Sequence, residues 1–243
     1  MLTTKKLKPL LPQEDYLPHV AYDCVIFGFD GKELKILILE YHNTGYFALP
    51  GGFIKVSESI DTAVKHGLKE RTGLDNIYLE QFYTFGSMSR VAPDTMRTIL
   101  KANDFDCVES NWLFDRFISV AYYALINYNS VTLKPDEFSD SINWYAIDEL
   151  PDLMMDHNEI SKKALQVLRA NLEKNLIGMN LLPDKFTMKE LKEVYEVILG
   201  EKLGRTSFQR KILSLDILIR HEKLYTGGAH KAPYVYSFKT KNN

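Results

Sequence analysis

The sequence predicts an α+β protein of two domains, a mixed-sheet domain followed by a C-terminal winged helix-turn-helix. Three observations predict this fold: strand-like runs that alternate with helical segments, a shift in charge after residue 182, and a helix, turn, helix and hairpin in that order at the end of the chain. Of the 243 residues, 45% are hydrophobic and 26% are charged. This composition is typical of a globular protein with a substantial core.

Simple patterns exclude several classes of protein. The sequence has no run of about 18 apolar residues that would span a membrane, and residues 1–19 lack the apolar segment of a signal peptide. The two cysteines, Cys24 and Cys107, lie far apart and form no CxxC pair. We therefore predict a cytoplasmic protein with buried thiols, no cofactor, no metal site and no membrane contact.

The net charge of −2 conceals an asymmetry along the chain. Up to Leu182 the sequence has 18 Lys and Arg against 25 Asp and Glu, whereas the remainder has 12 against 7. A basic domain attached to an acidic one is typical of a protein in which only one domain meets a polyanion. A chance distribution of charges remains an alternative, so charge alone does not establish DNA binding.

The first domain is predicted from its turns and periodicity. Two strands flank the tight turn at Asp30-Gly31, and a helix runs from near Ser57 to the stop at Gly73. Further strands are expected within 76–86, 117–126 and 141–147, and a helix over 157–176 ends the domain near Ile177. The intervening segment 87–115 is too long for an ordinary connection and is a candidate lid or interface.

The C-terminal part has the order of a winged helix-turn-helix. Thr187 and Glu190 match a capping box, and Gly200 ends the helix that follows. A second helix is expected within 206–221, with Phe208, Ile212 and Leu215 facing inward, and residues 222–239 form a hairpin. Taken singly, each feature also fits an amphipathic surface helix or an ordinary hairpin, and a protein-interaction module remains an alternative. Their order at the basic end of the chain favours DNA binding.

The stretch "GGFIKVSESIDTAVKHGLKERTGL", residues 51–74, resembles the Nudix box. The framework of this box is matched at Gly52, Glu58, Leu68, Glu70, Gly73 and Leu74. In Nudix hydrolases, glutamates on this helix hold divalent cations, which need several anionic oxygen ligands, against a substrate diphosphate.

The carboxylates of the box are mostly missing from this sequence. His66 and Gly67 stand where Arg-Glu is expected, and Arg71 replaces the second Glu of the closing pair, so that only Glu70 remains. A cation at Arg71 repels Mg²⁺. The chain is therefore predicted not to be an enzyme. The alternative is a hydrolase of nucleoside-diphosphate derivatives with substitute ligands, such as Glu58 with Glu70.

The chain from about residue 19 to residue 239 is similar to the Nudix-related transcriptional regulators, which join a degenerate Nudix domain to a C-terminal winged helix. Segments such as "FALPGGF", "FISVAYYALI" and "LLPDKFTMKELKEVYEVILG" carry this resemblance. It implies a Nudix-type α/β/α sandwich that senses a small molecule (residues 1–177) and a winged helix DNA-binding domain (residues 178–243). It also implies a homodimeric regulator, here predicted to be a repressor of operator DNA.

The effector is predicted to be a small sugar such as L-arabinose, with ADP-ribose as the alternative. The resemblance implies an effector of one of these two kinds, and the sequence shows neither an intact metal site nor basic residues at Glu40-Tyr41-His42 to neutralise a diphosphate. An acidic, aromatic pocket suits the hydroxyls and apolar faces of a sugar. The candidate effector-binding residues are Asp23, Glu40, Tyr41, Phe53 and Asp156.

The candidate DNA contacts lie at the start of the second helix, in the wing and at the start of the preceding helix. They are Arg205, Thr206, Ser207, Gln209, Arg210, Lys211, His230, Lys231 and Lys189. Arg and Gln can read base edges, whereas Lys, Ser and Thr more often hold phosphates. Two copies of the winged helix reading a palindrome would supply the affinity that one copy lacks.

Overall fold

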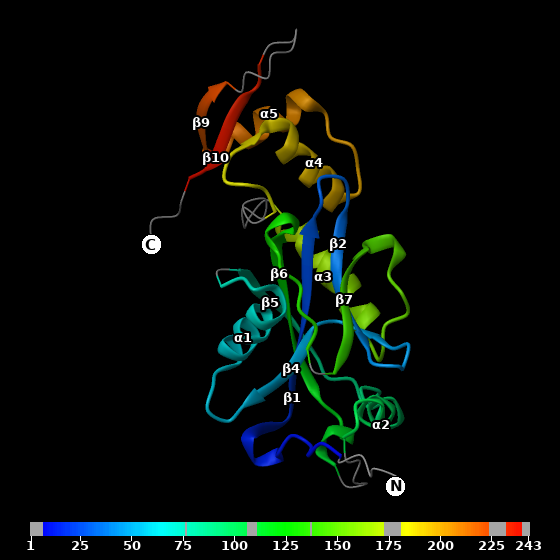
Figure 1. Cartoon of the computed structure of the whole chain (residues 1–243). Coiled ribbons are helices and arrows are strands. Elements are labelled where there is room, and N and C mark those ends of the chain that lie inside the picture. Colours follow the sequence, from blue (N-terminus) through cyan, green and yellow to red (C-terminus); the bar gives the residue numbers. More distant parts are fainter. Residues whose placement is uncertain are drawn as a thin grey trace.

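The computed structural model describes residues 7–75, 77–105, 111–136, 138–172, 181–223 and 232–239. It contains a first domain built on a large sheet and a smaller winged helix domain at one end of it (Figure 1). In chain order the elements are η1 (Gln13–Asp15), β1 (Tyr16–Phe29), β2 (Leu34–Tyr41), β3 (Phe47–Ala48), β4 (Gly51–Lys55), α1 (Ile60–Thr72), β5 (Tyr78–Phe85), α2 (Pro93–Ala102), η2 (Trp112–Phe114), β6 (Ile118–Asn127), η3 (Tyr128–Ser130), β7 (Ser139–Ala146), η4 (Ile147–Glu149), α3 (His157–Asn171), β8 (Phe186–Thr187), α4 (Met188–Leu199), α5 (Arg205–Ser214), β9 (Leu218–Lys223) and β10 (Tyr234–Phe238).

The large sheet is mixed, as predicted, and β1 is its central strand. Its main order is β3-β2-β1-β6-β5, with β4 paired to β1 and β7 paired to β2. The pairing of β1 with β6 is parallel, from Val20 opposite Ile118 to Phe29 opposite Asn127, whereas the other pairings are antiparallel. This parallel pair requires a long crossover between its strands.

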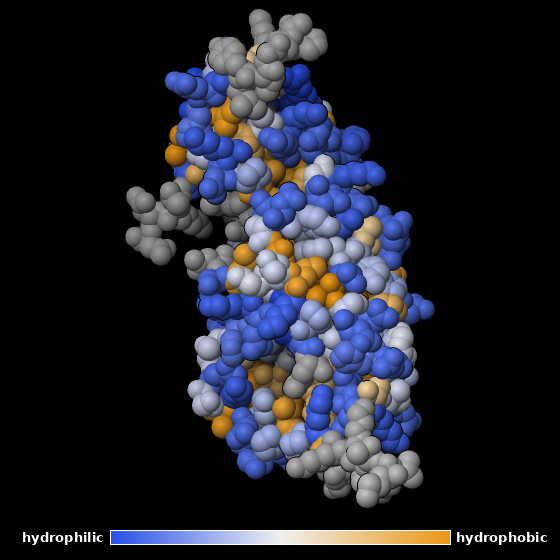
Figure 2. Space-filling model, viewed as in Figure 1, coloured by the Kyte–Doolittle hydropathy of each residue, from blue (hydrophilic) through white to orange (hydrophobic). Residues whose placement is uncertain are grey.

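Helices cover both faces of this sheet and complete the predicted α/β/α sandwich. Successive side chains of a strand point to opposite faces. Val25 and Phe27 of β1 accordingly join the core cluster under α3, while Cys24 and Ile26 join the cluster under α1. Figure 1 shows α1 on one side of the sheet and α3 on the other. On the face shown in Figure 2 the surface is mostly hydrophilic, and apolar side chains show in recesses between polar ones.

The turns and helix ends of the first domain follow the chemistry of their residues. Asp30 Oδ1 accepts hydrogen bonds from the backbone N–H groups of Lys32 and Glu33, which closes the predicted hairpin. Helix α1 begins slightly later than predicted because the N-cap is Ser59, whose Oγ accepts from Thr62 N–H. It ends at Gly73, which has a φ of 73° and therefore favours glycine.

The winged helix domain has the predicted order, with one correction. The capping box of Thr187 and Glu190 is present between β8 and α4, α5 follows, and β9 and β10 complete the three-stranded sheet β8-β10-β9. The prediction of a second helix within 206–221 was too long, because Asp216 has a positive φ of 52° and residues from Leu218 form β9. Leu215 is consequently 40% exposed instead of facing inward. The tip of the predicted wing, with His230 and Lys231, lies outside the described residues.

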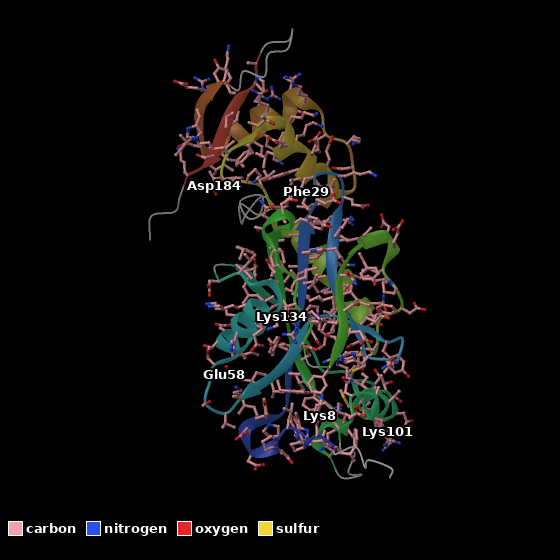
Figure 3. All side chains as sticks on the ribbon, viewed as in Figure 1. Lys8, Phe29, Glu58, Lys101, Lys134 and Asp184 are labelled. Carbon is pink, nitrogen blue, oxygen red and sulfur yellow. The ribbon has the colours of Figure 1, made fainter. Side chains whose placement is uncertain are left out.

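The two domains share one hydrophobic cluster. Leu168 and Leu172 of the first domain pack in the same cluster as Leu191 and Val194 of α4. Phe29, which is labelled in Figure 3, lies at the end of β1 and belongs to the same cluster. Within the described ranges, no helix is long and apolar enough to span a membrane.

We predict that Thr187→Ala lowers the free energy of unfolding by about 1 kcal/mol, because it removes the side chain that caps α4. Urea denaturation of the full chain measures this change. Lys162→Ala, on the exposed side of α3, is the control and should change stability by less than about 0.5 kcal/mol. Equal stability of the two variants would contradict the role of the cap.

Candidate functional site

A cavity of about 560 Å³ opens at one end of the large sheet. Its walls come from β1, from the β3–β4 loop and β4, from the end of α1 and from the segment between β5 and β6. The cavity volume is within the range of about 300–1,000 Å³ that is usual for pockets holding drug-sized ligands. The sequence therefore builds a candidate binding site where several loops and strand ends meet.

The parts of segment 87–115 that the structure describes contribute to the cavity wall. Helix α2 contributes Met96, Ile99 and Leu100 to the lining, and η2 contributes Leu113. The ring of Trp112 packs against Phe53 of β4, with 5.0 Å between the ring centroids. These aromatic contacts attach the segment to the sheet.

A buried arginine from this segment organises the inner end of the cavity. Arg90 is 4% exposed and lines the cavity. Its Nη2 donates to Asp23 Oδ2 at 2.9 Å, and its Nε donates to Asp156 Oδ1 at 2.9 Å. Ser119 Oγ also donates to Asp23 Oδ2, at 2.6 Å. The guanidinium thereby joins β1 to the residue that precedes α3.

A histidine completes this polar cluster. The backbone N–H of Leu49 donates to His157 Nδ1 at 3.0 Å, so the ring proton of the neutral histidine lies on Nε2. Nε2 is 3.6 Å from Asp23 Oδ1. Burial lowers the pKa of His157, and the Arg90 charge lowers it further against the opposing effect of Asp23. The histidine is therefore neutral at pH 7 and holds the first turn of α3 against the β3–β4 loop.

The helix of the Nudix-like box carries a fixed cation where the hydrolases carry a ligand carboxylate. Arg71 donates through Nη1 to the carbonyl of Gly67 and through Nη2 to the carbonyl of Gly51, both at 3.0 Å. Its Nη2 also pairs with Asp136 Oδ2 at 2.8 Å. Burial lowers the pKa of Arg71, but Asp136 together with Tyr22 and Tyr41 outweighs this effect and the pKa is raised overall. The guanidinium therefore stays charged inside the box.

The remaining positions of the box are also unsuited to several cation ligands. Glu70 is exposed and lies 3.5 Å from His66 Nε2. A Cβ at Gly67 would meet the Tyr22 hydroxyl well inside van der Waals contact, so this position has no room for the missing glutamate. No group of three or more His, Cys, Asp or Glu side chains within the described ranges is placed to hold a metal ion.

The structure brings most of the predicted effector residues together. Asp23, Tyr41 and Phe53 line the cavity, and Asp156 binds Arg90 beside it. Glu40 does not line the cavity. Its neighbours Leu39 and Tyr41 do, and consecutive strand residues point to opposite faces, so Glu40 instead accepts a hydrogen bond from Ser141 on β7.

Two basic residues of this cavity, Arg90 and Lys134, were not predicted from the sequence. They line it together with Arg71 of the box, and Lys134, labelled in Figure 3, is exposed there. Arg90 follows a predicted strand, but its partners lie 66 and 67 positions away in the chain. The prediction of a sugar effector rested on the lack of basic residues at Glu40-Tyr41-His42, whereas the cavity takes its basic side chains from other segments of the chain.

The predicted DNA contacts on α5 face solvent. Arg205, Thr206, Ser207, Arg210 and Lys211 are exposed and Gln209 is half-buried, whereas Phe208 and Ile212 are buried in the core. Lys189 on α4 is also exposed and pairs with Glu193 at 3.6 Å. Lys189, Arg205 and Gln209 line one open groove between the winged helix domain and the β1–β2 turn of the first domain. Helix α5 thus presents a polar face with three basic side chains beside a groove.

Comparison with known proteins identifies both domains. Residues 17–168 match the NUDIX domain, and residues 178–238 match the NrtR DNA-binding winged helix domain. The chain belongs to the NrtR-type Nudix family. The matched ranges agree with the two domains in the structure, and each contains one of the candidate sites described above.

Relatives of the NrtR type extend over most of the chain. The ADPR responsive transcriptional repressor NtrR of Acinetobacter baylyi is 26% identical over 88% of this chain and 80% of its own length. Shewanella oneidensis NrtR is 28% identical, and its crystal structure aligns with a TM-score of 0.70 over 91% of this chain and 94% of that one. The structure of Shewanella oneidensis NrtR complexed with a 27mer DNA aligns with the same TM-score, over 90% of this chain and 93% of that one.

We predict that Gly67→Ala destabilises the protein by about 1–2 kcal/mol. Alanine normally stabilises a helix by about 1 kcal/mol relative to glycine. Here the new methyl group collides with the buried Tyr22 hydroxyl, and such overpacking costs about 1–3 kcal/mol.

The melting temperature and urea midpoint of the full chain measure the effect of Gly67→Ala. Gly86→Ala is the matched control, because its Cβ would meet only Ile118 at an ordinary distance of 3.8 Å. An increase in stability for Gly67→Ala would show that Tyr22 moves freely and that the box has room for a side chain.

Proposed function

We propose that this protein is a transcriptional repressor that binds operator DNA through its winged helix and is controlled by an effector bound in the cavity of its Nudix domain. The observation that carries the proposal is the exposed polar face of α5 within a domain that matches the NrtR winged helix. The similarity to a DNA-bound NrtR over most of the chain supports the same reading. A recognition helix places the residues of its first turns against base edges in the major groove.

The effector that we propose is ADP-ribose. The Acinetobacter baylyi relative is described as ADPR responsive, and it is similar to this chain over both domains. The cavity has a volume suited to a nucleotide, which is much larger than a pentose. Its lining includes the cations Arg71, Arg90 and Lys134, which can meet a diphosphate, although acidic side chains lie beside them. The comparisons give no support to L-arabinose, which therefore serves as a test ligand and not as the proposed effector.

Hydrolysis is not part of the proposed function. A Nudix mechanism needs carboxylates that gather divalent cations at the diphosphate. Here Arg71 places a charged guanidinium in the box, and Gly67 has no space for a carboxylate side chain. A repressor that bound its effector without cleaving it would respond to the effector concentration without depleting it.

We further propose that the protein acts as a homodimer. One winged helix presents a single recognition helix, and regulators of this kind usually reach sufficient affinity by placing two recognition helices on a palindromic site. The half-site spacing would then be one helical turn of DNA or a multiple of it.

We expect the full chain to bind saturably to a DNA duplex from the region upstream of its own gene. Fluorescence anisotropy in the presence of nonspecific competitor DNA measures this binding. Binding should weaken steeply with salt, because several phosphates are neutralised. ADP-ribose should weaken it and L-arabinose should not. If neither ligand affects binding, the proposed effector is wrong. The proposed repressor function would be contradicted if the protein bound neither this duplex nor genomic fragments. It would also be contradicted if the DNA binding did not change with salt. Incubation of the protein with ADP-ribose and Mg²⁺ or Mn²⁺ should release no product.

We predict that Arg210→Ala weakens binding at the operator by about 1–3 kcal/mol, because an exposed arginine on α5 reads a base edge. The same anisotropy titration measures the loss. Arg116→Ala, an exposed arginine of the Nudix domain, is the matched control and should leave DNA affinity unchanged. Equal affinities of the two variants would place Arg210 on a solvated face that does not meet DNA.

A further inference from the structure

Helix α3 connects the cavity to the winged helix domain. It has 15 residues and is therefore about 22 Å long at 1.5 Å per residue. Its first turn meets the cavity through His157, and its last turn packs against α4. Different side chains hold the two ends of α3, and at each end they do so through hydrogen bonds.

At the cavity end, Arg90 holds the residue that precedes α3. Asp156 occupies the N-cap position, but its side chain caps no helix N–H and instead pairs with Arg90 Nε. The neighbouring Met155 has a positive φ of 54°, which is uncommon for a residue other than glycine. Met155 also lines the cavity and is 41% exposed. The start of α3 is thus held in an unfavourable backbone conformation by contacts at the cavity.

Arg90 also carries a hydrogen-bond donor that is not used. Nη1 is buried and has no hydrogen-bond partner among the residues that the structure describes. A buried donor without a partner is rare and unfavourable, so it favours any ligand that supplies an acceptor. Because Nη1 is buried, an effector oxygen in the cavity reaches it when the guanidinium moves toward the cavity. Because the guanidinium is planar and rigid, this movement also displaces Nε and Nη2 from their two carboxylates.

At the far end, Arg169 fixes α3 to α4. Its Nε donates to the carbonyl of Ile198 at 2.7 Å, one of the last carbonyls of α4 that have no partner within the helix. The positive charge also lies at the negative end of the α4 dipole. The hydroxyl of Tyr195 on α4 donates to the carbonyl of Leu172 at 3.5 Å. Movement of α3 along its axis would therefore act directly on α4.

The turn from α4 to α5 is equally constrained. Glu196 of α4 accepts the backbone N–H of Leu203 at 2.7 Å and pairs with Lys192 at 2.6 Å. The proposed recognition helix α5 begins two residues after Leu203, at Arg205. Because this connection is short and hydrogen-bonded, a displacement of α4 would also move the start of α5.

We propose that Arg90 is the residue that senses the effector, and that it transmits effector binding to the DNA-binding surface through Asp156, helix α3 and Arg169. An oxygen of the effector, such as a phosphate or ribose oxygen, accepts from Nη1 and loosens the pair with Asp156. Helix α3 then shifts against α4 and changes the position of α5. This inference rests on the proposed function, because it assigns the regulation of the same site.

Two matched pairs of variants test the two ends of α3 in the full chain. Arg90→Lys keeps the charge beside Asp23 and Asp156 but loses the forked donors. Its control is Arg97→Lys, on α2, where the arginine pairs with Asp94 at 2.8 Å. Arg169→Gln removes the cation at the end of α4, and its control is Lys162→Gln, at an exposed position of the same helix.

For each protein we measure the affinity for ADP-ribose by calorimetry and the affinity for the operator duplex with and without ADP-ribose. In the wild type the ratio of the two DNA affinities is the coupling factor, which in allosteric proteins is roughly 5–150-fold. Arg90→Lys should bind ADP-ribose at least about tenfold more weakly, the loss expected for one good charge-assisted hydrogen bond. Arg169→Gln should bind ADP-ribose and free operator as the wild type does, but with a clearly smaller coupling factor, since only the shared hydrophobic cluster and Tyr195 then join α3 to α4.

The outcomes separate this inference from the proposed function. A wild type whose DNA binding does not respond to ADP-ribose overturns the proposed effector and this inference with it. If the wild type does respond to ADP-ribose, either of two results overturns this inference alone. One is a normal affinity of Arg90→Lys for ADP-ribose, and the other is a normal coupling factor in Arg169→Gln. If Arg90→Lys does not fold, Asp156→Asn replaces it, and there an unchanged coupling factor overturns the inference.

Discussion

The pleat of strand β1 is the constraint on which both halves of the site depend. Tyr22 and Asp23 are consecutive, so their side chains point to opposite faces of the sheet. Tyr22 meets α1 and closes the space at Gly67, whereas Asp23 meets Arg90 and His157 beside α3. Because β1 also pairs with β2, β4 and β6, it cannot shift without disturbing the whole sheet. The altered Nudix box and the polar cluster are therefore held in a fixed relation.

Arg71 illustrates how one substitution changes what the Nudix box can do. A divalent cation in a hydrolase is exchangeable and brings open coordination positions, whereas a guanidinium is covalently attached and its donors are mostly occupied. Arg71 uses three hydrogen bonds to Gly51, Gly67 and Asp136. A buried ion pair of this kind adds little net stability, because desolvation offsets the attraction. What it provides is a permanent positive charge at the cavity that neither needs a metal nor activates water.

The sequence predicted the elements that depend on local chemistry and missed those that depend on distant partners. Gly73 as a helix stop and the box of Thr187 and Glu190 were recognisable, because each involves residues a few positions apart. The predicted end of the second helix in the winged helix domain was wrong, because the positive φ of Asp216 is not apparent from the neighbouring residues. Arg90 was missed because its carboxylate partners come from distant parts of the chain, Asp23 from β1 and Asp156 from the position before α3. Glu40 was misplaced although the alternation of β2 already distinguishes it from Tyr41.

The shared core explains why the two domains can influence each other. A flexible linker between separate cores would let the winged helix move independently of the cavity. Here Leu168 and Leu172 of the Nudix domain pack directly with Leu191 and Val194 of α4 in one cluster. Packed interfaces resist continuous deformation and tend to have discrete arrangements. Helix α3 is held at one end by the ion pair of Arg90 and at the other by this packing, so a change in that pair can be passed to α4 through the shared core.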